Sequence, residues 1–199
     1  MKKIIYIVSF ISFGIILLLS SCSKKILDYN DPNNINTDSY FNTPEQIQEG
    51  ATGIYSAFFY DHLMGWRWEE MFDALGNEFS CRPAALSNEA AIVAFWHYQF
   101  NNNNDVVTGY WQFLYRIVLR SNLVLFKGQE YLDKNKDNNA MVTQSMGEAY
   151  FLRGWAYSQL AFYWRRVPIR TNYDQTANVF PARSTSADDE WAVAESDYK

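Results

Sequence analysis

The chain has 199 residues, a formal net charge of −5 and an aromatic content of 18%. That length allows one domain with a single large core once a targeting segment is set aside, and the aromatic rings must be buried in that core or displayed to a ligand. The negative charge argues against nucleic acid as a partner, because affinity for phosphate backbones depends on clustered lysine and arginine.

Residues 1–21 have the pattern of an export signal, with Lys2 and Lys3 before a mostly apolar run over 4–19. The run is short for a membrane-spanning helix, which needs about 20 apolar residues. It ends in Leu-Ser-Ser-Cys at 19–22, which resembles the bacterial lipobox. The resemblance implies cleavage before Cys22 and a lipid on its thiol. The alternatives are an uncleaved anchor helix and an ordinary signal peptide.

Residues 22–42 are predicted to form a lipidated tether, because this segment is polar, contains Pro32 and has little apolar surface to offset the entropy of ordering. The helical part is expected to occupy residues 43–199. With Cys22 assigned to the lipid, Cys81 is the one other cysteine and no disulfide framework is implied.

The first helix is expected to begin at Thr43, which can cap it, with Pro44 at the first helical position and Gln46 completing a capping box. Its apolar face is predicted from residues at helical spacing, namely Ile47, Ala51, Ile54, Tyr55 and Phe58. Short helices are predicted over 66–75 and 87–98. Residues 76–85 and the four asparagines at 101–104 are predicted to be loops.

Two longer helices follow. The first carries an apolar stripe from Trp111 to Leu125 and is expected to end at Gly128, and 134–139 is a polar turn. The second carries apolar residues from Met141 to Tyr163, with Pro168 just beyond its end, so the two predict a helical hairpin. A last helix is expected to start near Ser186 and to bury Trp191, Ala194 and Tyr198. No segment shows sustained alternation of apolar and polar residues, so the predicted fold class is all-α.

Several segments resemble the SusD/RagB family of surface lipoproteins. They are Leu27-Asp28 with Asp31-Pro32 and Thr37, Tyr40 to Thr43, Gly53 to Tyr55, Trp111 to Ile117 with Ser121-Asn122, and Gly147 to Tyr157 followed by Val167-Pro168. The last of these resembles the family pattern A-E-A-x-F-L-R-A-x-x-Y…V-P. Arg165-Arg166 departs from the family, which commonly has Gly-Asp or a similar turn before Val-Pro.

The resemblance implies an α-helical scaffold of tetratricopeptide-like hairpins that binds glycan at the outer membrane, without catalysis, and delivers it to a TonB-dependent SusC-like transporter. It implies no cofactor. Family members are usually much longer, so we expect this chain to be a fragment or a truncated gene product that lacks the C-terminal half of the fold.

Sugar binding needs flat aromatic faces together with amide or charged groups that pair with hydroxyls. Family ligand residues from this half of the fold usually lie between the early helices and the tryptophan-containing helix. The predicted ligand residues are Trp66, Trp68, Arg82, Trp96, Tyr98 and Asn101. The alternative is that Trp66, Trp68 and Trp96 are core anchors of short helices.

Other polar residues are expected to have structural or solvent-exposed roles. Arg153 lies in an apolar helix near Glu148, and we expect its charge to be paired within the hairpin. His62 and His97 lack cysteine or carboxylate residues at metal-ligand spacing, so no metal site is predicted. Glycosidase carboxylates could come from Glu69, Glu70, Asp73 and Glu78, but such a cluster is more typical of a solvated helix face.

The main alternative to glycan binding is a helical scaffold lipoprotein that binds a peptide or protein partner, because helical hairpins commonly do so. A surface glycosidase is the third interpretation, and release of reducing ends would be its signature.

Overall fold

The computed structural model describes residues 37–78, 89–136, 138–173 and 181–199. The chain divides into two compact units, Met1–Tyr40 and Phe41–Lys199. Of the first unit, the structure describes one helical turn, α2 (Thr37–Tyr40). The predicted signal peptide, Cys22 and most of the predicted tether therefore lie outside the described residues.

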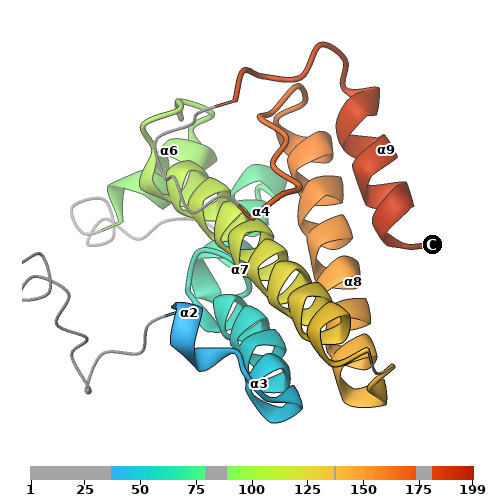
Figure 1. Ribbon diagram of the computed structural model, residues 1–199. Coiled ribbons are helices and arrows are strands. Elements are labelled where there is room, and N and C mark those ends of the chain that lie inside the picture. The colour runs from blue at the N-terminus through green and yellow to red at the C-terminus, as the bar shows by residue number, and fades with distance from the viewer. Residues whose placement is uncertain (1–36, 79–88, 137, 174–180) are drawn as a thin grey trace, which may run out of the picture. The chain divides into compact units, whose positions relative to one another are not determined.

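The second unit is built from helices, which Figure 1 shows in chain order. They are α3 (Pro44–Tyr55), the 3₁₀ helix η2 (Ser56–Phe59), α4 (Trp66–Gly76), α6 (Ala90–Trp96), α7 (Asp105–Asn135), α8 (Ala140–Tyr163) and α9 (Asp188–Asp197). Within the described ranges the β-structure is one isolated bridge between Pro168 and Arg183. The all-α prediction is confirmed. In these same ranges, no helix combines the length and apolar character needed to cross a membrane.

Helix α3 begins as the sequence predicts. The Thr43 hydroxyl accepts from the Gln46 amide nitrogen at 3.3 Å, and the Gln46 side chain accepts from the Thr43 amide nitrogen at 3.1 Å. Ile47 and Ile54 are fully buried from this helix, as the predicted apolar face requires. Tyr55 is 40% exposed, so it departs from the predicted face.

Helices α7 and α8 form the predicted hairpin, and α3 packs against both (Figure 1). The prediction that α7 ends at Gly128 is wrong, because α7 continues to Asn135 and Lys136 follows in a left-handed conformation with φ of 49°. Gly128 is buried, and a Cβ there would lie 2.6 Å from Cγ of Met146 on α8. This glycine therefore permits the close approach of α8 instead of ending α7.

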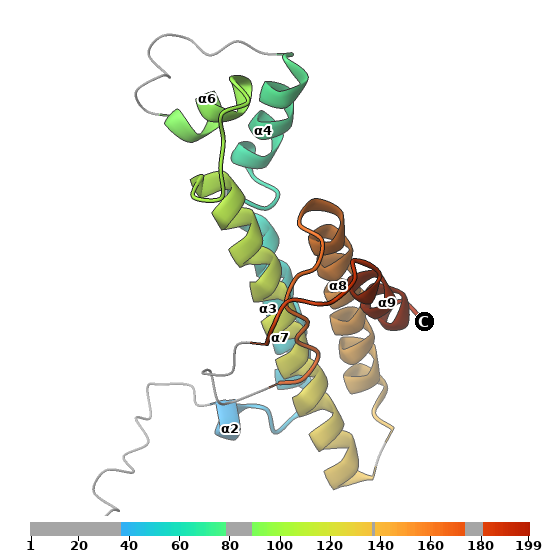
Figure 2. The ribbon, with the colours of Figure 1, turned by 90° about the horizontal axis from the view of Figure 1, so that it is seen from above.

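The early helices α4 and α6 lie beside each other near the start of α7 (Figure 2). Their shared cluster contains Met71 and Ala74 from α4, Ile92 and Phe95 from α6, and Val106 from α7. The predicted 87–98 helix is shorter in the structure, where it ends at Trp96. Residue 87 lies outside the described residues.

Several residues of the family-like motifs hold the extended segment after α8. Tyr115 donates to the carbonyl of Pro168 at 2.6 Å, and Asn122 donates to the carbonyl of Arg170 at 2.9 Å. The Tyr157 hydroxyl accepts from the amide nitrogen of Arg170 at 2.6 Å. These side chains come from α7 and α8, so the motifs encode the attachment of this segment to the hairpin.

Arg153 completes this network. Its Nη1 donates to the Asn122 side chain at 2.7 Å and to the Thr171 carbonyl at 2.9 Å. Its Nε and Nη2 bind both carboxylate oxygens of Asp197 at 2.8 and 2.6 Å. The predicted structural role is confirmed, but the charged partner belongs to α9 and not to the hairpin.

The turn between α8 and Val167 is unusual. Arg165 and Arg166 both have positive φ, 52° and 50°, in the left-handed region that favours glycine. Arg183 donates to the Arg166 carbonyl at 2.6 Å, and the amide nitrogen of Val167 donates to the buried carboxylate of Glu190 at 2.5 Å. These contacts hold a backbone conformation that the two arginines disfavour.

Helix α9 begins at Asp188, near the predicted start, and the Asp189 carboxylate accepts from the amide nitrogen of Ser186 at 3.0 Å. Of its three predicted apolar residues only Ala194 is buried, whereas Trp191 and Tyr198 are 41% and 48% exposed. Helix α9 packs on α8, where a Cβ at Gly154 would lie 3.1 Å from the Tyr198 ring.

Candidate functional site

The predicted aromatic residues of α4 have different surroundings. The Trp68 ring stacks on Tyr110 with centroids 3.8 Å apart and meets Tyr163 edge-on at 5.5 Å, so it packs within the aromatic core. Trp66 is 42% exposed, and the guanidinium of Arg67 lies 4.8 Å from its ring centroid. Trp66 is therefore the more accessible of the two.

Trp96 and Tyr98 lie at the opposite end of α4. The Trp96 ring nitrogen donates to the Asn77 side chain at 3.3 Å, and the Tyr98 hydroxyl donates to the Leu75 carbonyl. Asn77 follows the last residue of α4, roughly 15 Å along the helix axis from Trp66. The structure thus does not bring Trp66 together with Trp96 and Tyr98.

Of the two remaining predicted residues, the structure describes Asn101. The Asn101 side chain accepts from the amide nitrogen of Asn103 at 2.9 Å, which stabilises the local turn. The same asparagine run supplies the cap of α7, because the Asn104 side chain accepts from the amide nitrogen of Val106 at 3.0 Å. Arg82 lies outside the described residues.

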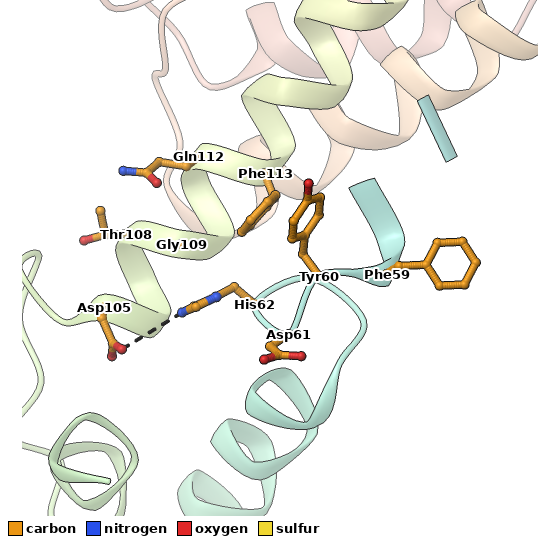
Figure 3. A pocket seen from close by; sticks show the side chains of 9 residues that line it. All are labelled: Phe59, Tyr60, Asp61, His62, Asp105, Thr108, Gly109, Gln112 and Phe113. Carbon is orange, nitrogen blue, oxygen red and sulfur yellow. Dashed lines mark ion pairs between the residues drawn. The ribbon is translucent and has the colours of Figure 1, made fainter. Parts of the chain in front are cut away.

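A pocket of about 640 Å³ opens between the loop after η2 and the first turns of α7 (Figure 3). Two segments that lie more than 40 residues apart in the sequence meet there. The lining residues are Phe59, Tyr60, Asp61 and His62 from the first segment and Asp105, Thr108, Gly109, Gln112 and Phe113 from the second.

The pocket has a polar side and an aromatic side. On the polar side, His62 Nε2 lies 4.0 Å from Asp105 Oδ2, and Arg67 Nη1 lies 3.2 Å from the same oxygen. On the aromatic side, the rings of Tyr60 and Phe113 stack with centroids 4.4 Å apart. Phe59 also lines the pocket, but its side chain is 88% exposed and points away from the other labelled side chains (Figure 3).

Sequence reasoning missed this pocket. The sequence pattern around His62 predicts no metal site and assigns this residue no other role. Within the described residues, no group of three His, Cys, Asp or Glu side chains could hold a metal ion. The helical start at Asn104-Asp105 was a usable signal, because it places Thr108, Gln112 and Phe113 on successive turns of α7. The loop that faces them carries no comparable signal.

The comparisons with known proteins agree with one another. Residues 25–199 match the model of a SusD-like family described as starch-binding and associating with the outer membrane. A crystal structure of a SusD superfamily protein from Bacteroides vulgatus superposes with a TM-score of 0.66 and 20% identity, covering 80% of this chain and 34% of that chain. This chain therefore spans about a third of the length of that relative, and the likeness shows the fold. Among curated proteins no significant match was found.

Proposed function

Because the chain belongs to the SusD-like family, we propose that it is a non-catalytic lipoprotein of the outer membrane that captures glycan and passes it to a TonB-dependent SusC-like transporter. The observation that carries the proposal is the family match over residues 25–199, whose description names starch binding and association with the outer membrane. The solved relative supports the helical scaffold on which such a site would be built.

Membrane attachment is proposed to occur through a lipid on Cys22. Two or three acyl chains would hold the protein firmly, because each buried methylene contributes about 0.8 kcal/mol. Polar residues 22–42 would then separate the lipid from the helical unit.

Accessible aromatic and polar side chains support a sugar ligand. Trp66 and Tyr98, 42% and 65% exposed, are the predicted ligand residues most available to stack on a pyranose ring. Arg82, Trp68, Trp96 and Asn101 complete the proposed set. Trp68 and Asn101 already serve in packing and in a turn, so we expect their loss to affect stability as well as binding.

The proposal is tested by measuring retention of fluorescent glycans on cells that express the full chain, compared with cells that express Cys22→Ala. We expect the wild-type chain in the outer-membrane fraction with bound glycan, and the variant to be lost from that fraction. A chain that reaches the outer membrane but retains a protein partner and no glycan would favour the scaffold alternative. Release of reducing ends would instead indicate a glycosidase.

A further inference from the structure

We infer that the pocket between residues 59–62 and the start of α7 is a saccharide subsite that accepts neutral or amino sugars and rejects acidic ones. The inference rests on the proposed function and adds the place of one subsite and its ligand class. The pocket lies apart from Trp96 and Tyr98. Its lining residue Asp105 pairs with Arg67, which lies at the start of α4 next to Trp66, whereas Trp96 and Tyr98 contact the other end of that helix.

Two glycines without room for a side chain determine the shape of this pocket. A Cβ at Gly109 would lie 2.3 Å from Cδ2 of His62 and 2.9 Å from its Cβ, so the imidazole rests directly on the α7 backbone. A Cβ at Gly65 would lie 2.4 Å from the Cα of Asp61, so the loop closes tightly on itself. The loop that presents Asp61 and His62 therefore packs closely against α7.

Unused polar groups face this pocket. Asp61 and Gln112 are exposed lining residues, and neither side chain has a hydrogen bond or ion pair with any other described residue. A carboxylate only accepts hydrogen bonds, whereas an amide both donates and accepts. Sugar hydroxyls can satisfy both groups, because each hydroxyl donates one hydrogen and accepts through its lone pairs.

The charges of the pocket determine which sugars it can take. Its two formally charged lining residues are Asp61 and Asp105, while the nearby Arg67 is shared between Asp105 at 3.2 Å and Glu89 at 3.6 Å. Arg116 is outside the lining, and its guanidinium lies over the Phe113 ring at 4.7 Å and over the Tyr60 ring at 5.1 Å. The lining carboxylates of Asp61 and Asp105 would repel a uronate or sulfate, whereas they would attract an ammonium group.

The aromatic side suits the apolar face of a sugar. Tyr60 and Phe113 stack on each other, and Figure 3 shows them beside the polar side formed by His62 and Asp105. The Arg116 guanidinium also lies 5.1 Å from the centroid of the Tyr60 ring, and Tyr60 remains 41% exposed. The exposed part of its side chain is the surface proposed to meet a C–H face. One pyranose unit could therefore meet carboxylate, amide and ring surface in the same cavity.

The experiment measures binding of the full chain, purified with its lipid in detergent, to an array of neutral, amino-sugar, uronate and sulfated oligosaccharides. Binding of the best glycan is then measured for Asp61→Ala and Gln112→Ala. The matched control is Glu69→Ala, which removes an exposed carboxylate of α4 outside the pocket. We expect neutral or amino glycans to bind, Asp61→Ala to weaken them roughly 10- to 100-fold, and the control to leave affinity within about twofold.

The outcomes separate the inference from the function on which it rests. Glycan binding that Asp61→Ala and Gln112→Ala leave unchanged, or a preference for uronate or sulfated glycans, overturns the inference while the proposed function stands. Failure of the wild-type chain to bind any glycan on the array overturns both. Circular dichroism of each variant identifies any loss that comes from unfolding, and Asp61→Asn then repeats the test with the side-chain shape retained.

Discussion

Removal of Arg153 should destabilise the helical unit strongly. The side chains of Arg153 and Asp197 are 7% and 5% exposed, and two charge-assisted hydrogen bonds join them. Arg153→Met would leave the Asp197 carboxylate buried without its partner and would also remove a donor from Asn122 and Thr171. Breaking one side of a buried ion pair costs about 3–5 kcal/mol, which is a large part of the total stability of a domain.

The assay is urea unfolding followed by far-ultraviolet circular dichroism. Arg153→Met should lower the free energy of unfolding by about 3–5 kcal/mol through a lower midpoint, with an unchanged dependence on urea. The matched control is Glu148→Gln on the same helix, where the half-buried carboxylate accepts from Gln144 at 3.2 Å and from the Tyr55 hydroxyl. Glutamine keeps an acceptor at this position, so the free energy of unfolding should fall by less than about 0.5 kcal/mol. A loss below 1 kcal/mol for Arg153→Met, or an equal loss for both variants, would refute the buried-pair account.

Three further predictions concern backbone and burial. In the same urea assay, Gly109→Ala should lower the free energy of unfolding by about 1–3 kcal/mol, because the new Cβ would clash with His62. Gly147→Ala should raise it by up to about 1 kcal/mol, because the space around Gly147 is open and alanine favours a helix. Equal effects of the two variants would contradict the close packing at Gly109. Arg165→Gly should raise the free energy of unfolding by about 0.5–1 kcal/mol, because glycine adopts a positive φ at lower cost than arginine. A lower free energy of unfolding would show that the conformation at residue 165 is not strained. Burial raises the pKa of Tyr157 to about 12. The contribution of Tyr157 to the free energy of unfolding is therefore complete below pH 10 and is lost between pH 10 and about 12, at about 1.4 kcal/mol per pH unit. Tyr157→Phe should make this alkaline decline less steep without abolishing it, because burial also raises the pKa of Tyr110 and Tyr115. An unchanged slope would exclude a contribution from Tyr157.

The helices were predictable because their signals are local. The Thr43 capping box, the α7–α8 hairpin and the start of α9 follow from caps and apolar spacing, which act within a few residues. Gly128 misled the prediction because a glycine can either end a helix or admit a neighbouring one, and only the position of Met146 distinguishes these cases. The role of Gly128 therefore depends on tertiary packing, which the local sequence pattern does not show.

The site was less predictable for the same reason. Arg153 could be recognised as structural from its apolar helix, but its partner Asp197 lies 44 residues away, and no spacing rule connects the two. The pocket likewise joins His62 to Asp105 across the chain. The departure at Arg165-Arg166 was visible in the sequence, and its positive φ values explain why glycine suits this turn.

The central claim is that this chain binds glycan, and calorimetric titration of the purified full chain with the glycan that cells retain best tests it most directly. The account predicts saturable binding with one defined stoichiometry and no release of reducing ends. Absence of a binding signal with every retained or arrayed glycan, from protein shown to be folded, would contradict it.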